Sequence, residues 1–250
     1  MTETRSRKAF KTCLMTLICF CLVLTGVFIF APLEAEAAVG DTFTVDNITY
    51  EVLTETGNTF TVEVCGHTLT ENTVVNIPDT VTNGNRTYTV KQIGYEAFRD
   101  CSYLTGITLP ESVTVIDDRA FYNCTALAGI KIPSGVERID LYTFYNCTAL
   151  IEVELPEGLT VLDNGAFRDC ISLTTVTLPG TLQRIGSQTF DGCTNLETIN
   201  IPQSVEDIDT YAFQNCAKLT SIEIPLSITV IRNYTFRGCV ALENVTLPED

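Results

Sequence analysis

Tryptophan is absent from this chain, histidine occurs once, and basic residues are scarce. Fifteen lysines and arginines stand against 31 aspartates and glutamates, which gives a formal net charge of −16. Without residues 1–37, which hold four basic and three acidic side chains, the formal charge is −17. Binding to nucleic acid begins with neutralisation of phosphates by basic side chains. The composition therefore predicts that nucleic acid is not a partner.

A histidine base for catalysis is also in short supply. The only histidine is His67, so a serine or cysteine nucleophile has almost no base available, and a Gly-rich phosphate loop is absent. Glu152 and Glu154 could imitate the carboxylate pair of a glycosidase. They share one short strand pattern, however, and such pairs more often form a solvated face. We expect no enzymatic activity and no cofactor.

The first 37 residues have the composition of a secretory signal. Four basic side chains between Arg5 and Lys11 precede an apolar run at 13–30, and Ala35-Glu36-Ala37 offers a small-x-small site for signal peptidase. We expect cleavage after Ala37. The alternative is an uncleaved anchor at 13–30, because this run is near the lower limit for spanning a bilayer. Either interpretation places the remaining residues outside the cytoplasm, secreted or at the cell surface.

Most of the remaining chain repeats itself every 23 residues. Seven phenylalanines and seven cysteines keep this interval without an insertion or deletion, each cysteine three positions after its phenylalanine. The two columns are Phe98, Phe121, Phe144, Phe167, Phe190, Phe213 and Phe236, and Cys101, Cys124, Cys147, Cys170, Cys193, Cys216 and Cys239. A constant interval of this size indicates one supersecondary unit copied and stacked, which is a solenoid.

Each copy follows the pattern L-x-x-I/V-x-L/I-P-x-x-V/L-x-x-I/L-x-x-x-A/T-F-x-x-C. Residues 152–155 alternate between acidic and apolar side chains, which predicts a strand, and Pro156 ends it because proline lacks an N–H. Segment 163–170 predicts one short turn of helix that packs its phenylalanine inward. The Asp, Asn or Gly before each cysteine predicts a left-handed turn residue. We therefore expect an α/β solenoid of seven 23-residue coils, mainly β with short helical turns, over residues 90–250.

Residues 38–89 do not follow the 23-residue interval. They alternate in strand fashion, and one imperfect copy of the repeat strand survives at 75–78. Pro78 lies 32 residues before Pro110, so nine extra residues near 82–90 interrupt the phase. This pattern predicts a β-rich amino-terminal cap that covers the first coil.

The repeats from Ile93 to Pro248 resemble the leucine-rich repeats of the BspA-like type, which are common on bacterial surface proteins. The resemblance implies that the strands line a concave face. It also implies that the chain serves as an adhesion or protein-binding module.

The cysteine column leaves three interpretations open. Stacked thiols could bind a metal, form disulfides between coils, or pack as small buried hydrophobes. No Cys-x-x-Cys pair occurs, and the interval is too regular for separate four-ligand sites. We expect a structural ladder of phenylalanines and cysteines without a metal.

The outward positions of the repeat strands vary, whereas the inward positions do not. They are rich in threonine and glutamate, which favours a partner of basic character. The candidate interaction face consists of Lys131, Glu152, Glu154, Thr177, Glu197, Asn200, Glu223 and Glu243. We expect it to bind an extracellular protein or glycan. The alternatives are a merely solubilising surface, a structural element that self-associates through its open carboxyl-terminal end, or a fragment of a larger multidomain surface protein.

Overall fold

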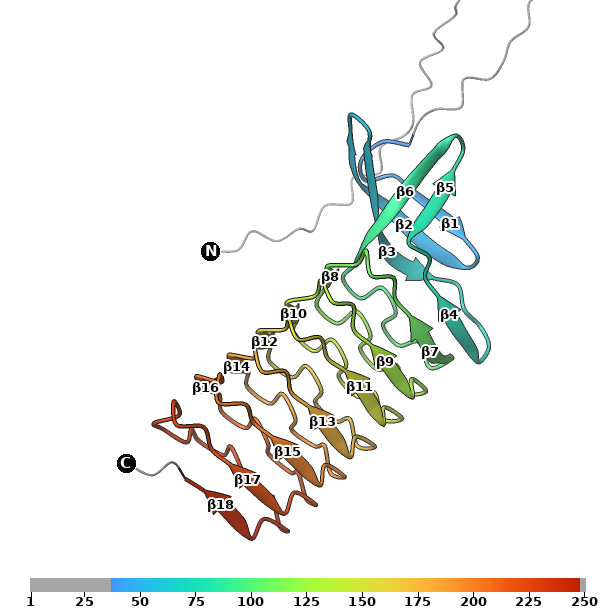
Figure 1. Ribbon diagram of the computed structural model, residues 1–250. Coiled ribbons are helices and arrows are strands. Elements are labelled where there is room, and N and C mark those ends of the chain that lie inside the picture. Colours follow the sequence, from blue (N-terminus) through green and yellow to red (C-terminus); the bar gives the residue numbers. More distant parts are fainter. Residues whose placement is uncertain (1–36, 248–250) are drawn as a thin grey trace, which may run out of the picture. The chain divides into compact units, whose positions relative to one another are not determined.

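A computed structural model of the chain describes residues 37–247 (Figure 1). The expected signal segment at 1–37 therefore lies outside the described residues, except for Ala37. The secondary structure of the described part consists of strands and turns. No helix in it is long and apolar enough to cross a membrane.

The amino-terminal region is a twisted sheet in the order β1-β2-β3-β6-β5. Its strands, together with β4, are β1 (Thr42–Val45), β2 (Ile48–Thr56), β3 (Thr59–His67), β4 (Thr73–Asn76), β5 (Thr80–Asn83) and β6 (Arg86–Ile93). Alternating residues bury one face of the sheet, including Tyr50, Val62 and Tyr88. The β5–β6 hairpin contains the nine extra residues, and Gly84 supplies a positive φ at its tip.

The sheet continues directly into the repeats. Parallel to β6 runs β8 (Val115–Ile116), and β4 pairs with β7 (Leu104–Thr108), placing Val75 beside Ile107. The imperfect strand copy at 75–78 thus adds a strand to the repeat array. As a result, the apolar side of the first coil is covered by the amino-terminal region.

Parallel strands with a register of 23 residues form one side of the array, here called the strand wall (Figure 1). After β4 and β7 it contains β9 (Gly129–Lys131), β11 (Glu152–Glu154), β13 (Thr175–Thr177), β15 (Thr198–Asn200), β17 (Ser221–Glu223) and β18 (Asn244–Thr246). Val153 lies beside Ile130, and Ile199 beside Val176, so the apolar residues of successive coils meet inside.

Two-residue strands form a second side, here called the short-strand wall. After β8 they are β10 (Arg138–Ile139), β12 (Val161–Leu162), β14 (Arg184–Ile185) and β16 (Asp207–Ile208). They also pair in parallel with a 23-residue register.

The third side, here called the turn wall, differs from the expected helical turn. In the fourth coil, the N–H groups of Ala166, Arg168 and Cys170 donate to carbonyls three residues earlier, at 3.1–3.2 Å, so the segment is a series of tight turns. Its residues Gly165 and Asp169 have φ values of 65° and 61°, which a right-handed helix excludes. The Phe167 N–H is thereby free to donate to the Thr189 carbonyl of the next coil, at 2.9 Å.

Left-handed residues occur at two positions of every coil. The one before each cysteine agrees with the expectation from the sequence: Asp100, Asn123, Asn146, Asp169, Gly192, Asn215 and Gly238. The second, two residues before each phenylalanine, was not expected: Glu96, Arg119, Tyr142, Gly165, Gln188, Tyr211 and Tyr234. Repeated inter-coil hydrogen bonds hold this conformation even where the residue is large.

The two columns of the repeat lie in the interior between these walls. Successive phenylalanine rings stack with centroids 5.3–5.7 Å apart and planes within 11° of parallel. From Cys124 onward, each thiol lies 3.0–3.2 Å from the phenylalanine carbonyl of the preceding coil and donates to it. Each of these carbonyls also accepts the backbone N–H of the cysteine in its own coil, so the thiol adds a second, inter-coil hydrogen bond to the same oxygen.

His67 occupies the amino-terminal end of the aromatic column. Its ring stacks on Phe98, with centroids 5.5 Å apart and planes 9° from parallel. The Leu69 N–H donates to Nδ1 at 3.2 Å, and the Cys101 thiol lies 4.0 Å from the same nitrogen. Burial lowers the pKa of His67. The single histidine is therefore the aromatic residue that ends the column.

Candidate interaction surfaces

All eight residues of the candidate interaction face are exposed on the strand wall. Lys131 ends β9, Glu152 and Glu154 flank the buried Val153 of β11, and Glu223 ends β17. Glu197 and Glu243 lie one residue before β15 and β18, at the rim of this wall. The alternation of the strands explains their common orientation, because successive side chains point to opposite faces.

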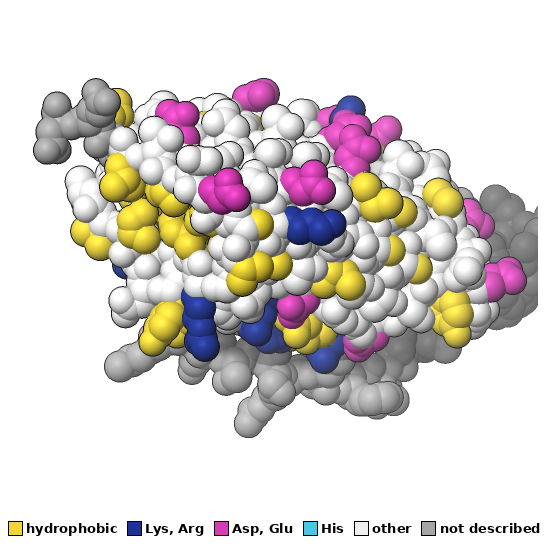
Figure 2. Space-filling view, turned by 90° about the horizontal axis from the view of Figure 1, so that it is seen from below, with side chains coloured by type: hydrophobic (Ala, Val, Ile, Leu, Met, Phe, Trp, Pro, Cys, Tyr) yellow, Lys and Arg dark blue, Asp and Glu magenta, His cyan; other side chains and the backbone are white. Residues whose placement is uncertain are grey.

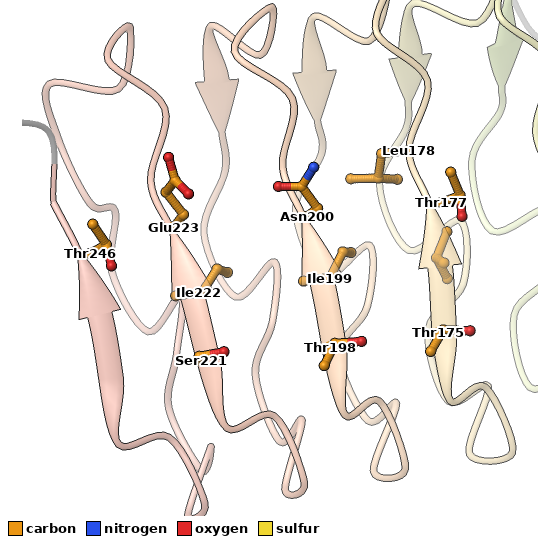
Figure 3. Close-up of a pocket in the computed structure, with 11 residues that line it drawn as sticks. Thr175, Thr177, Leu178, Thr198, Ile199, Asn200, Ser221, Ile222, Glu223 and Thr246 are labelled. Atoms are coloured by element: carbon orange, nitrogen blue, oxygen red, sulfur yellow. The ribbon is translucent and has the colours of Figure 1, made fainter.

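The structure brings three of the eight together in a shallow hollow of about 480 Å³, over β13, β15, β17 and β18. Thr177, Asn200 and Glu223 form one row across neighbouring strands (Figure 3). A second row in the same hollow consists of Thr175, Thr198 and Ser221. The remaining five lie outside this hollow: Lys131, Glu152, Glu154, Glu197 and Glu243.

The second row belongs to the hollow and occupies outward strand positions of the repeat, although it is not among the eight candidate residues. Thr175, Thr198 and Ser221 carry no charge, and only their shared register with the first row could have indicated them. Two exposed apolar side chains lie on the same wall and are also not among the eight candidate residues. Val74 is 70 % exposed and Ile151 is 57 % exposed.

The charges of the strand wall differ from those of the short-strand wall. Within residues 37–247, none of the eight candidate side chains takes part in an ion pair or a side-chain hydrogen bond. On the short-strand wall, by contrast, Arg184 contacts Asp163, Asp207 and Asp209 at 3.3–3.5 Å. Groups without an intramolecular partner remain available to an external one. The strand wall is therefore the more suitable surface for binding.

Figure 2 shows acidic side chains scattered over one view, with most basic side chains along its lower margin.

An acidic trio near the start of the short-strand wall could be mistaken for a cation site. The carboxylates of Asp117, Asp118 and Asp140 lie within 4.8 Å of one another. Asp117 accepts the Asp118 N–H, Asp118 accepts the Leu141 N–H, and Asp140 pairs with Arg138. Their oxygens thus already hold the local turns together.

The ladder cysteines are placed as core residues. None of the seven forms a disulfide. Burial raises the pKa of the Cys124 and Cys170 thiols, and that of Cys147 to about 12. A metal or a disulfide partner reacts with the thiolate form. The arrangement thus favours the interpretation as packing residues.

Comparison with known proteins identifies the repeat. The model of the BspA type leucine-rich repeat region, in six copies, matches residues 71–183 and 160–250. A leucine-rich repeat protein from Bacteroides ovatus is 39 % identical, with a TM-score of 0.77, over 82 % of this chain and 53 % of that one. The present chain therefore spans about half of that protein's length.

Two further solved structures share the fold. The leucine-rich repeat protein TpLRR of T. pallidum is 25 % identical, with a TM-score of 0.59, over 82 % of each chain. The pneumococcal vaccine antigen PcpA is 21 % identical, with a TM-score of 0.57, over 84 % of this chain and 71 % of that one. No curated protein matches the chain.

Leucine-rich repeat arrays generally act as binding scaffolds, because the stacked strands create an extended surface whose side chains can vary. The matched region extends from residue 71 to residue 250 and includes every coil of the array. The phenylalanine and cysteine columns, the parallel strand wall and this match agree, and the chain belongs to the BspA-type leucine-rich repeat family.

Proposed function

We propose that this protein acts outside the cell, secreted or surface-displayed, and binds an extracellular protein or glycan of basic character through its strand wall. The observation that carries the proposal is the set of exposed strand-wall side chains that make no ion pair or side-chain hydrogen bond, three of which line a hollow. Five of the eight are glutamates, and only Lys131 is basic, so electrostatic complementarity favours a basic surface.

The composition of residues 1–37 supports an extracellular location. The description of PcpA as a vaccine antigen is in keeping with it. Binding on this wall involves no catalytic step.

Charge reversal on the strand wall tests the proposal. Glu152, Glu154 and Glu223 are changed together to lysine, and binding to a panel of purified matrix glycoproteins and glycans is measured by interferometry. The matched control reverses three exposed glutamates outside the strand wall, Glu137, Glu157 and Glu206. We expect at least one member of the panel to bind the unmodified chain and the control variant, and not to bind the strand-wall variant. Equal binding by all three proteins contradicts the assignment.

The last described coil favours a second candidate function, self-association. Among the described residues, β18 is the last strand of the strand wall and its three residues are exposed, as are Val240 at 86 % and Leu247 at 59 %. Figure 2 shows apolar side chains gathered at the left end of the view. An edge strand of this kind can pair with a second copy of the chain.

Light scattering over a range of concentrations tests this second candidate. The average mass of the unmodified chain should rise with concentration, and Val245→Lys on β18 should suppress the rise, because an edge lysine opposes strand pairing. A constant monomer mass at high concentration excludes self-association.

A further inference from the structure

The turn wall carries a cluster of arginine and tyrosine side chains that the strand-wall function does not use. Three of the eleven basic residues in 38–250 lie here, together with three tyrosines. They line a hollow of about 400 Å³, formed by Arg99, Arg119, Tyr122, Tyr142, Tyr145 and Arg168. This volume lies within the range of small-ligand sites.

The core of the cluster is a continuous stack over four coils. The Arg99 guanidinium lies 5.2 Å from the centre of the Tyr122 ring, and the Tyr122 and Tyr145 rings are 4.6 Å apart. The Arg168 guanidinium lies 5.8 Å from the Tyr145 ring at the other end. Because these residues share one position of the repeat, the solenoid places them in a row.

Arg119 and Tyr142 extend the cluster from the adjacent position of the repeat. Both have left-handed backbones, with φ values of 57° and 54°, which side chains of this size rarely adopt. Tyr142 meets Tyr145 edge-on, with centroids 5.9 Å apart. Two neighbouring columns thus enclose the hollow.

Several donors in the hollow have no partner within the described residues. Arg99 uses Nη1 and Nε towards Glu96 and Asp100, and Arg119 uses Nη1. Arg168 approaches Asp191 at 3.3 Å, yet makes no hydrogen bond, and its Nε is buried. The Nη2 groups of Arg99 and Arg119 and both terminal nitrogens of Arg168 are therefore available. None of the paired carboxylates lines the hollow.

We propose that this hollow binds a negatively charged sugar, carrying sulfate or carboxylate groups, within an extracellular polysaccharide. Guanidinium groups are suited to sulfate and carboxylate because their N–H donors match the oxygens in pairs. Tyrosine rings beside them supply apolar surface.

A polysaccharide fits this surface better than an acidic peptide. The backbone N–H groups of Arg119, Asn123 and Tyr142 already donate to carbonyls of the next coil, at 2.7–3.0 Å. A peptide could therefore not add a strand to this wall, and recognition must use side chains alone. Only a short stretch of the polysaccharide should contact the protein, since the chain as a whole is acidic and repels an extended polyanion.

A stack of the same chemistry elsewhere provides the matched control. Tyr211 and Tyr234 stack at 5.0 Å, and Arg237 lies 5.5 Å from the Tyr234 ring. None of these three lines the hollow. Stacking is thus a general consequence of the repeat, whereas the hollow with available guanidinium donors marks the site.

Calorimetric titration of the full chain tests the proposal, with a sulfated heparin tetrasaccharide, its desulfated counterpart and a glutamate-rich peptide as probes. We expect saturable binding of the sulfated probe, weakened at least about tenfold by desulfation or by the pair Arg119→Gln and Arg168→Gln, because the loss of a hydrogen bond between charged groups weakens binding by about tenfold or more. Arg237→Gln should change the affinity less than about twofold.

Three results overturn the proposal. They are no binding of the sulfated tetrasaccharide, equal affinity for the desulfated probe, or an equal loss in Arg237→Gln. Tighter binding of the glutamate-rich peptide would assign the hollow to acidic proteins instead. Thermal unfolding of each variant checks that the fold is retained.

Discussion

At the scale of the residue, the interior of each coil is set by a phenylalanine, a cysteine and a small residue before the ring. Phe167 is fully buried between Phe144 and Phe190, and the small side chain of Ala166 beside it is fully buried as well. Where threonine replaces alanine, as at Thr189, its hydroxyl donates to a carbonyl three residues earlier, at 2.8 Å. Burial of a polar group is tolerated there because it is hydrogen-bonded.

Truncation inside the column should be far more harmful than truncation on the strand wall. Phe167→Ala empties the middle of the stack and should lower the free energy of unfolding by about 3–5 kcal/mol. Thr177→Ala, on the exposed side of β13, should lower it by less than about 0.5 kcal/mol. Urea titration followed by circular dichroism measures both. Equal effects would contradict the orientation of the coils.

His67 should make the stability of the fold depend on pH. Its pKa in the folded chain is below its ordinary value, so the unfolded chain takes up this proton first as pH falls. Protonation of Nδ1 would also remove the acceptor of the Leu69 N–H. The stability contributed by neutral His67 is present above about pH 6.5 and lost below it.

The variant His67→Phe keeps an aromatic ring on Phe98 and removes the titrating group. We expect its free energy of unfolding to fall less between pH 7 and pH 5 than that of the unmodified chain. If the free energy of unfolding changed equally with pH in the two proteins, His67 would not contribute to the pH dependence of stability.

At the scale of the element, the strands and the left-handed residue before each cysteine were predictable, whereas the second left-handed position was not. Alternation in residues such as 152–155 identifies the buried side of a strand, and the 23-residue interval identifies its neighbours. The second left-handed position holds Glu96, Arg119 or Gln188, which give no local signal for a positive φ. Hydrogen bonds between coils impose that conformation, and they depend on the stack rather than on the residue.

This imposed conformation can be tested by introducing glycine at the second left-handed position of one coil and removing it from that of another. Gln188→Gly should stabilise the fold by about 0.5–1 kcal/mol, because a left-handed conformation is unfavourable for a residue with a Cβ and glycine relieves it. Gly165→Ala should destabilise it by about 1–2 kcal/mol, since its φ is 65° and a Cβ there would collide with the Tyr142 ring. Thermal unfolding compares the two. A loss of stability in Gln188→Gly would contradict this explanation.

The candidate surfaces were predictable to the same extent as the elements that form them. Exposure of Glu154 or Asn200 follows from strand alternation. The hollow beside Asn200 requires the relative positions of four strands, and the turn-wall cluster requires two columns to meet. Neither follows from a residue pattern within a single coil.

At the scale of the whole molecule, each coil contacts only its neighbours, so burial declines towards the carboxyl-terminal end of the described array. Phe236 and Cys239 are only partly buried, whereas Phe144 and Cys147 are inaccessible. Coils in a linear array can open from an end while the centre remains folded.

Thiol labelling should reveal this gradient. Under native conditions a reagent that alkylates accessible thiols should modify Cys239 at least about tenfold faster than Cys147. The reason is that opening of the last described coil requires less free energy than opening of the centre. Timed labelling followed by peptide mass spectrometry measures the rates. Uniform rates for the two cysteines would indicate that the array opens as a single unit.

The constant register of the parallel strands has an evolutionary consequence. Residues 116–138 and 139–161 occupy equivalent places, and the strands after each pair with the same 23-residue offset. Loss or duplication of one such segment by recombination within the gene would therefore leave every column in phase. The molecule can change its length in whole steps, and its binding area with it, while its interior is preserved.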